Sequence, residues 1–389
     1  MKVLIYFPEN QLSPKGGPAG YLYNLKQQIK KDKSISIDFI SANNVSSNLF
    51  YDVLSSVNRA INFLLYRNSR IRFLKHKVWE SKKKSKVNIN DYDIVHFHGT
   101  LDIFTERENL KTYRGLVLLT SHSPKVFFRE NIEDYMDSNI YNKYKIFCDS
   151  LERVDKYAFE RADFVLFPCK EAEEPYYHSW KAYAKIRNKL KIRYISTGIM
   201  PEKIEESRED IRKELNIPDD AFVISYVGRH NTVKGYDTLI DIFFKLDNVY
   251  VICCGSQGSI KSPESKRWIE IGWTNKPFTY VNASDVMIIP NRETYFDLAL
   301  LQALSIGKML LISDRGGNKY FKYNEDKGIF VFNEMDDALA YIKKIRQFDS
   351  SEIISRKAKM INYFMCNFSN KVFYKNYCEL LISIYGEKC

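Results

Sequence analysis

Two cations stand close together in a glycine-bounded loop of the second half of the chain. Arg229 and Lys234 lie between Gly228 and Gly235, directly after the apolar, β-branched run 222–227. That run predicts a buried strand, and the apolar spacing that follows the loop predicts a helix. A guanidinium, an ammonium and a helix N-terminus together suit a phosphate group. The alternative is a plain strand–loop–helix connection with two solvated cations.

A second group of chemistry-bearing residues falls at strand ends in the first half. Two apolar runs are predicted to be strands that end in turns. The first carries His96 and His98, and the second carries His122. Neighbouring strands of a parallel sheet end at one crevice, where such sheets bind ligands. Because side chains alternate along a strand, we expect His96 and His98 to face opposite sides, with one ring toward the crevice. Gly16 and Gly17 follow the first strand and let backbone N–H groups approach a ligand, although a simple turn is the alternative.

The elements that must position these residues alternate between strand and helix along the whole chain. A length of 389 residues exceeds what one core covers, so two domains are expected. The alternation predicts an α/β protein with two doubly wound parallel sheets. We expect an N-terminal domain over 1–198, a C-terminal domain over 199–370, and a final helix over 371–389 that packs back on the N-terminal domain.

Charge and cysteine content indicate which cellular compartment and which partners to expect. The net charge of +11 indicates an anionic partner. Seven scattered cysteines with no CxxC pair favour free thiols in a reducing compartment over disulfides or a zinc site. We expect no metal site, because the six histidines form no ligand-spaced cluster. The chain start does not read as a signal peptide and no long apolar run occurs, so we expect a cytoplasmic protein.

One basic segment raises the question of a membrane. Arginines and lysines alternate with large apolar residues over 67–86, directly after an apolar stripe of helical spacing over 50–65. This composition suits the anionic inner face of a membrane, with peripheral attachment. The competing interpretation is a solvated helical face beside a stripe that packs in the core. We expect no nucleic acid partner, because no nucleic-acid-binding module accompanies the segment.

Taken in order, these motifs resemble the retaining glycosyltransferases of the GT4 family. That family has the GT-B architecture, in which two Rossmann-like domains face each other across a cleft. The strings that carry the likeness are the glycine loop at 16–20, the strings ending in His98-Gly99 and His122, Ala162-Asp163, Gly228-Arg229 with Lys234-Gly235, Ala283-Ser284-Asp285, Pro290 to Gly307, and Gly316-Gly317.

The resemblance implies a nucleotide-sugar donor in the C-terminal domain and a glycan or polyprenyl-diphosphate-linked acceptor on the N-terminal side, with no cofactor. Arg229 and Lys234 would neutralise the donor diphosphate and act in catalysis. His122 would lie at the catalytic site near the transferred sugar, and His98 is expected on the acceptor side. The implied donor-binding residues are Gly16, Gly17, Arg229, Lys234, Gly255, Glu293, Thr294, Tyr295, Phe296, Asp297, Leu298 and Gln302.

The sequence departs from the family at two acidic positions. Where the family has two glutamates eight residues apart, this chain has Thr294 and Gln302. Gln302 can still hydrogen-bond a ribose hydroxyl, while Glu293 or Asp297 can contact the sugar. We therefore predict a retaining, metal-independent transferase of hexosyl or related groups in O-antigen, capsule or similar polysaccharide synthesis. The alternatives are a catalytically silent GT-B subunit that binds a glycan or partner enzyme, and a nucleotide-sugar epimerase of the same architecture.

Overall fold

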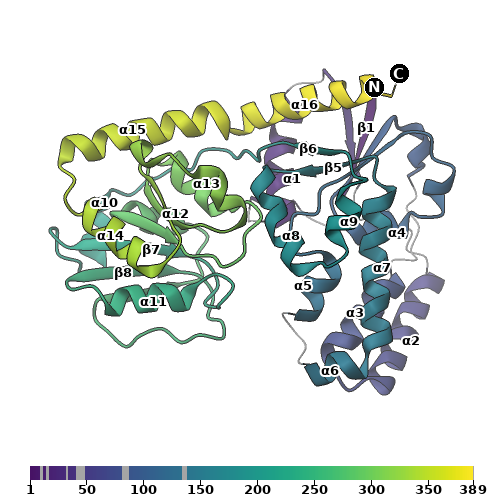
Figure 1. Ribbon diagram of the computed structural model, residues 1–389, viewed down its shortest axis with the longest axis horizontal. Coiled ribbons are helices and arrows are strands. Elements are labelled where there is room, and N and C mark those ends of the chain that lie inside the picture. The colour runs from purple at the N-terminus through teal and green to yellow at the C-terminus, as the bar shows by residue number, and fades with distance from the viewer. Residues whose placement is uncertain are drawn as a thin grey trace. The chain divides into compact units, whose positions relative to one another are not determined.

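The protein forms two compact units, each built on its own sheet. The computed structural model describes residues 1–8, 12–14, 17–31, 34–40, 49–80, 87–133 and 138–388. Unit 1 comprises Met1–Phe167, Pro175–Ile195 and Tyr377–Cys389, and unit 2 comprises Pro168–Glu174 and Ser196–Asn376. Each unit holds a six-stranded sheet whose strand pairs are all parallel. The expected α/β class with two doubly wound sheets is confirmed (Figure 1).

Unit 1 orders its strands β2-β1-β3-β4-β5-β6. The strands are β1 (Lys2–Tyr6), β2 (Ser36–Phe39), β3 (Ile94–Phe97), β4 (Leu116–Leu119), β5 (Phe164–Phe167) and β6 (Ile192–Tyr194). Its helices are α1 (Gly17–Ile29), α2 (Leu49–Leu65), α3 (Ser69–Glu80), η2 (Ile89–Asp91), α4 (Thr100–Thr105), η3 (Asn109–Lys111), α5 (Phe127–Glu133), α6 (Ser138–Lys143), α7 (Lys145–Arg161), α8 (Glu174–Ser179) and α9 (Tyr183–Arg187). The central strands are buried along their whole length, as their continuous apolar sequences predict.

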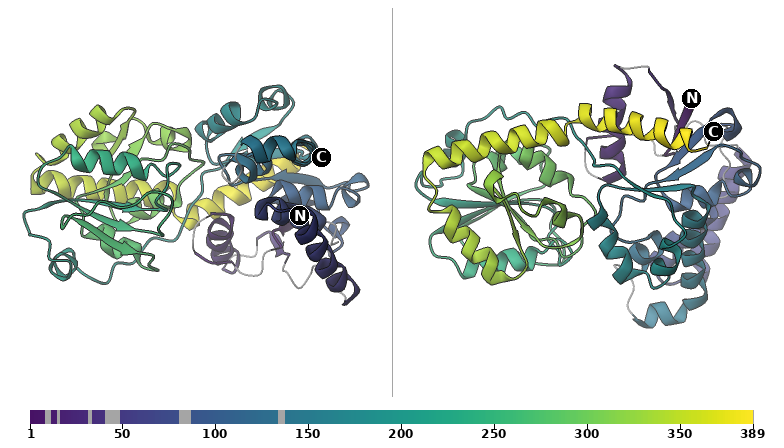
Figure 2. Two further views of the ribbon diagram at one scale, coloured as in Figure 1. Left: turned by 90° about the horizontal axis from the view of Figure 1, so that it is seen from below. Right: turned by 45° about the horizontal axis from the view of Figure 1, so that its top comes forward.

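Unit 2 orders its strands β12-β11-β10-β7-β8-β9. The strands are β7 (Phe222–Val227), β8 (Val249–Cys254), β9 (Trp268–Gly272), β10 (Val286–Ile289), β11 (Met309–Ser313) and β12 (Ile329–Phe332). Its helices are η4 (Lys170–Glu173), α10 (Arg208–Glu214), α11 (Tyr236–Phe244), α12 (Pro277–Asn282), α13 (Leu298–Ser305), η5 (Gly316–Phe321), η6 (Glu325–Lys327), α14 (Met335–Ile345), α15 (Ser350–Asn367) and α16 (Asn370–Gly386), whose last turns belong to unit 1. Helices α11 and α13 lie on opposite faces of this sheet (Figures 1 and 2).

The strand orders mark one position in each sheet as the place for a ligand. In unit 1 the chain passes from β1 to β2 and then returns to place β3 on the other side of β1. In unit 2 it passes from β7 through β8 to β9, and β10 then pairs with the free side of β7. Such switch points leave a crevice at the carboxyl ends of the two diverging strands. The crevices therefore lie after β1 and β3 in unit 1, and after β7 and β10 in unit 2.

Three aspartates that precede strands fix the neighbouring strand in register. Asp93, before β3, accepts the backbone N–H of Lys2 at 2.7 Å. Asp163, before β5, accepts that of Val117 at 2.8 Å. Asp285, before β10, accepts that of Val223 at 2.7 Å. The Ala-Asp and Ala-Ser-Asp strings thus join sheet strands at the end opposite to the ligand crevice, where an unpaired buried N–H would be costly.

Helix α2 presents its apolar stripe outward. Ser55 and Asn62 are buried, and Asn62 donates to Asn58 at 2.8 Å on the same side of the helix. Leu64 is 82% exposed and Leu65 is 67% exposed. The interpretation of 50–65 as a stripe packed in the core is therefore wrong for the described side chains. Periodicity reveals that a helix has an apolar face but not which way the face points.

Candidate functional site

Two glycines allow the strand-end loops of unit 2 to meet. A Cβ on Gly235 would lie 1.9 Å from the carbonyl oxygen of Pro290, and its φ of +64° is left-handed. A Cβ on Gly255, after β8, would lie 1.8 Å from the carbonyl oxygen of Gly228. Only residues without a side chain permit these approaches. The cation loop 228–235 is therefore held between the turn after β8 and the loop after β10, at the switch point.

Lys234 and Asp297 form an ion pair at this point. The Lys234 Nζ lies 2.8 Å from Oδ2 of Asp297, and Asn291 donates to the same oxygen at 2.8 Å. The other oxygen, Oδ1, accepts the N–H of Ala299 at 3.1 Å, so Asp297 is the N-cap of α13. Burial of Asp297 works against its charged form, but Lys234 and these hydrogen bonds outweigh it and lower the pKa of the carboxyl group.

Arg229 differs from Lys234 in its surroundings. Its side chain is exposed and forms no hydrogen bond or ion pair with any residue that the structure describes. Its backbone carbonyl accepts the Tyr226 hydroxyl at 2.8 Å, which fixes the start of the loop. The next residue, His230, is buried and stacks on Tyr236 with ring centroids 4.0 Å apart. Sequence reasoning missed His230, because a single histidine in a loop carries no spacing signal.

The loop after β10 places the other predicted donor residues. Thr294, Tyr295 and Phe296 are buried, whereas Glu293 and Leu298 are partly exposed. The carbonyl of Thr294 accepts the N–H of Gly317 at 3.2 Å, which joins this loop to the turn after β11. The buried ring of Phe296 packs against Phe321 and Phe368, with ring centroids 5.6 Å and 6.2 Å apart.

Gln302 has a partner that the sequence did not indicate. Its Nε2 donates to Oε1 of Glu202 at 2.5 Å, and Ser305 accepts the N–H of Glu202 at 3.0 Å. A carboxylate from a distant segment therefore lies beside the position where the resemblance expects a glutamate. The separation of 100 residues between Gln302 and Glu202 explains why no local pattern revealed it.

In unit 1, three histidines gather behind the ends of β3 and β4. His96 contacts the Tyr377 hydroxyl at 2.8 Å and the Thr120 hydroxyl at 2.9 Å. His98 Nδ1 lies 2.7 Å from His122 Nε2, and the rings of His96 and His98 are 4.1 Å apart. The expectation that His96 and His98 face opposite sides is wrong. The error lies in the spacing: side chains two residues apart along a strand share one face, so alternation itself places His96 and His98 on the same side.

All three imidazoles are neutral at physiological pH. Burial lowers the pKa of His122 to about 3, and burial with the nearby His122 lowers that of His96 to about 3. Burial and the two neighbouring histidines lower the pKa of His98 well below its usual value. A neutral pair can pass one proton between its nitrogens and present a donor or an acceptor, without adding positive charge.

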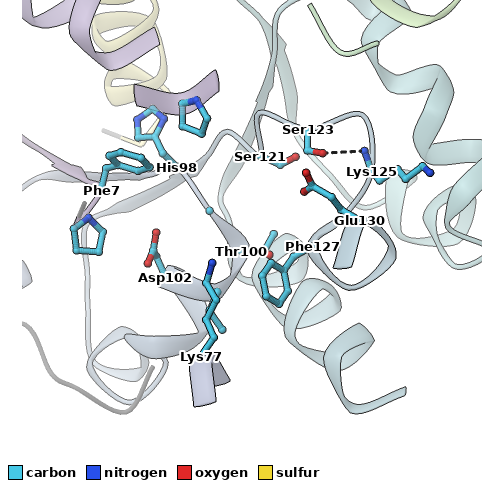
Figure 3. A pocket seen from close by; sticks show the side chains of 14 residues that line it. Phe7, Lys77, His98, Thr100, Asp102, Ser121, Ser123, Lys125, Phe127 and Glu130 are labelled. Carbon is cyan, nitrogen blue, oxygen red and sulfur yellow. Dashed lines mark hydrogen bonds between the residues drawn. The ribbon is translucent and has the colours of Figure 1, made fainter. Parts of the chain in front are cut away.

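A cavity of about 470 Å³ opens at the switch point of unit 1 (Figure 3). His98 lines it, with Phe7 and Phe127 as aromatic walls. Figure 3 shows the ends of Lys77 and Asp102 pointing toward the same space. The remaining polar lining side chains are Thr100, Ser121, Ser123, Lys125 and Glu130. Carboxylates and hydroxyls beside aromatic rings suit a sugar, and the lysines suit an anionic group attached to it.

The predicted glycine loop is described only in part. Gly17 is the first residue of α1, with a φ of +68° and no atom of the described residues within 4 Å of a Cβ built on it. Pro18, the next residue, lines the unit 1 cavity. Gly16 lies outside the described residues. The described end of this loop therefore belongs to the crevice of unit 1.

Part of the second unit is similar to a known protein family. Residues 207–364 match the model of the family described as Glycosyl transferases group 1. We refer to this matched segment as the group 1 domain. The group 1 domain contains the cation loop, the Lys234–Asp297 ion pair and all of α13.

Curated relatives of the chain are glycosyltransferases of prokaryotes. An uncharacterized glycosyltransferase of Methanocaldococcus jannaschii is 25% identical over 170 residues, which are 39% of this chain and 43% of that protein. The lipopolysaccharide 1,2-N-acetylglucosaminetransferase of Salmonella typhimurium is 24% identical over 201 residues, 45% of this chain and 53% of that protein. The chain thus spans about half the length of these relatives.

Solved structures extend the likeness in fold to nearly the whole chain. The Anabaena protein HepE, solved in complex with UDP, has a TM-score of 0.66 at 14% identity, covering 98% of this chain and 100% of that chain. The two parallel sheets and these GT-B neighbours identify the fold as GT-B, with the group 1 domain as its second Rossmann-like unit. Among the residues that the structure describes, no helix is long and apolar enough to cross a membrane.

Proposed function

We propose that this chain is a retaining, metal-independent glycosyltransferase that moves a hexosyl or related group from a nucleotide-diphosphate sugar to a glycan. The observation that carries the proposal is the placement of Arg229, Lys234 and the N-terminus of α13 together at the switch point of the group 1 domain. Parallel sheets bind phosphorylated ligands at such points. The lipopolysaccharide enzyme among the relatives supports a role in cell-surface polysaccharide synthesis, such as O-antigen or capsule.

In this proposal the cations stabilise the leaving diphosphate. Breaking the sugar–phosphate bond leaves charge on the diphosphate, and the guanidinium of Arg229 is proposed to stabilise that charge. Electrostatic stabilisation of this kind and correct orientation of the two substrates supply most of the rate enhancement. Transfer with retention places the acceptor oxygen on the face that the diphosphate leaves, so the leaving phosphate accepts the acceptor's proton. His122 and His98 then act as neutral hydrogen-bonding groups beside the transferred sugar.

The acceptor is proposed to enter the cavity of unit 1. Asp102, Glu130 and the serine hydroxyls offer hydrogen-bond acceptors to sugar hydroxyls, and Phe127 offers an apolar wall. Lys77 and Lys125 lie in the same lining and suit a phosphate, as in a polyprenyl-diphosphate-linked acceptor. A neutral oligosaccharide would leave the two lysines without a counter-charge from the ligand.

A lipid-linked acceptor also accounts for helix α2. Its outward side chains include Val57, Ile61 and Phe63, and Phe63 is 67% exposed. The adjacent α3 supplies Arg70 and Arg72, and α2 packs against α3 at one end of unit 1 (Figure 1). An exposed apolar face beside arginines complements the acyl and anionic layers of a bilayer. We therefore propose that α2 and the basic segment 67–86 attach the protein peripherally to an anionic membrane surface; residues 81–86 lie outside the described residues.

One experiment tests the proposed activity. The full-length protein is incubated with a panel of UDP-, GDP-, ADP- and TDP-sugars, with and without EDTA, and nucleotide release is measured. Release from one donor, unaffected by EDTA, and a product with the donor's anomeric configuration by NMR are expected. An inverted product would contradict the retaining mechanism, and loss of activity in EDTA would contradict metal independence.

A second candidate is a catalytically silent subunit of the same fold. It is favoured by the ion pair that occupies Lys234 and by Thr294 and Gln302 at the two expected acidic positions. Such a subunit would bind a glycan or partner enzyme and would release nucleotide from none of the donors in the panel. An epimerase would instead convert its donor without any acceptor.

A further inference from the structure

Asp297 holds two groups that the proposed function assigns to the donor phosphates. One is the Lys234 ammonium, at 2.8 Å from Oδ2, and the other is the N–H of Ala299 in the first turn of α13, at 3.1 Å from Oδ1. Asn291 donates to Oδ2 at 2.8 Å and holds the carboxylate in place. The carboxylate therefore makes the contacts that a phosphate oxygen would make at a helix N-terminus with a lysine beside it.

The exposure of the two side chains of the ion pair determines how a ligand would meet them. The Lys234 side chain is 32% exposed and that of Asp297 is 14% exposed, so the ammonium can be reached by a ligand while the carboxylate is mostly enclosed. A diphosphate bound against Lys234 would approach a fixed negative charge. Such repulsion is strong in a partly enclosed site, where water screens it poorly. Arg229, exposed and without a partner among the described residues, is left as the cation that an incoming anion meets first.

We propose that Asp297 is an internal counter-anion that occupies the phosphate position of the group 1 domain and lowers its affinity for diphosphates. The inference rests on the proposed function, because that function makes this crevice the donor site. Binding of a donor requires Lys234 to exchange the Asp297 carboxylate for a phosphate oxygen. The affinity for a diphosphate is then set by how much more strongly Lys234 binds a phosphate oxygen than it binds the Asp297 carboxylate, and not by the cations alone.

The test uses inorganic pyrophosphate as the probe and isothermal titration calorimetry of the full-length protein. Asp297→Asn removes the charge and keeps a side-chain oxygen to cap α13. Asp349→Asn is the matched control, because Asp349 is also an N-cap, accepting the N–H of Glu352 at 2.8 Å, and its removal changes the net charge equally. A third protein combines Asp297→Asn with Lys234→Met. Thermal unfolding of each variant verifies that it is folded, and Asp297→Ser serves as a second variant if Asp297→Asn does not fold.

We expect Asp297→Asn to bind pyrophosphate about tenfold more tightly than the wild type, which is about 1.4 kcal/mol. Asp349→Asn should bind as the wild type does, and the gain should disappear when Lys234→Met is added. Equal or weaker binding by a folded Asp297 variant would overturn the inference. A gain that persists without Lys234, or one shared by Asp349→Asn, would also overturn it.

The same titrations separate this inference from the proposed function. Each protein is also titrated with UDP, GDP, ADP and TDP. If Asp297→Asn gains affinity for pyrophosphate but no nucleotide binds more tightly than pyrophosphate, the counter-anion stands and the nucleotide-sugar donor is refuted. If a nucleotide binds the wild type and Asp297→Asn shows no gain for pyrophosphate or nucleotide, the donor site stands and the counter-anion is refuted.

Discussion

His98 and His122 are joined by a 2.7 Å contact between Nδ1 of the first and Nε2 of the second, although they follow different strands of unit 1. One ring must donate and the other must accept, because each neutral imidazole carries a single N–H. His122 has a φ of +61°, a conformation that non-glycine residues seldom adopt, and this turns its ring toward His98. Strained backbone of this kind is common at functional sites.

The histidine cluster predicts a loss of stability in mild acid. In the folded protein the pKa values of His96 and His122 are about 3. The usual value for a histidine is about 6.5. The unfolded chain therefore binds more protons, and stability that is complete above about pH 6.5 falls as the pH decreases toward 3. Each histidine contributes up to about 1.4 kcal/mol per pH unit.

Urea unfolding between about pH 7 and pH 5 measures this slope. His122→Asn, which tolerates a positive φ, should reduce the slope by the share of one histidine. A free energy of unfolding of unit 1 that stays constant across this range would contradict the neutral state of the cluster.

Replacing Arg229 by alanine should reduce transfer. If the guanidinium stabilises the leaving diphosphate, the loss in kcat/KM corresponds to about 2–4 kcal/mol, as for other single groups that stabilise a developing anion. The fold should be unaffected, because the side chain is exposed. Lys343→Ala, which removes an exposed cation from α14, should keep full activity. Equal rates for Arg229→Ala and the wild type would show that Arg229 does not stabilise the leaving diphosphate.

Gly235→Ala should damage the site through the backbone. The added Cβ would lie 1.9 Å from the carbonyl oxygen of Pro290, so the loop after β7 would have to move away from the loop after β10. We expect a loss of about 3 kcal/mol or more in unfolding free energy. Gly272→Ala is the matched control, because Gly272 has a similar φ of +72° but no atom of a described residue within 4 Å of its Cβ position. It should cost only about 1 kcal/mol; similar losses in thermal unfolding for the two variants would show that the close approach is unimportant.

Restoring the family's glutamate at 302 should not help this protein. Gln302→Glu would place a second carboxylate where the amide now donates to Glu202 at 2.5 Å. Repulsion between the two carboxylates should lower the melting temperature and weaken donor binding. The exchange Glu202→Gln with Gln302→Glu restores one donor and one acceptor, and should recover both. A single Gln302→Glu variant that is as stable as the wild type would contradict the pairing.

The outward face of α2 should determine attachment to membranes. In flotation assays we expect the wild type to rise with phosphatidylglycerol vesicles and to remain below with phosphatidylcholine vesicles. Leu64→Gln with Leu65→Gln should abolish flotation, because each leucine contributes about 1.5–3 kcal/mol when it is buried. Ile354→Gln is the control, since Ile354 on α15 is 68% exposed but belongs to unit 2. Flotation that persists in the double variant would show that other residues attach the protein to the vesicles.

The sequence by itself determined the α/β class, most of the strands and the order of the motifs. Buried strands such as β4 are continuous apolar runs, and glycines mark the ends of strands and helices, so local patterns were sufficient for the two parallel sheets. Local patterns also revealed the cation loop after β7, because strand, glycines and cations are contiguous in the chain. The edge strand β9, in which only Trp268 is buried, carries no continuous apolar run and was not predicted.

Only the tertiary structure decided which side chains meet. Lys234 and Asp297 are 63 residues apart, and Gln302 and Glu202 are 100 residues apart, so no periodicity connects them. The direction of the apolar face of α2 was likewise decided by what packs against the helix, and the burial of Asn62 could not be read from spacing. Strand and helix preferences are set within a few residues, whereas ion pairs and exposed faces depend on how distant segments are brought together.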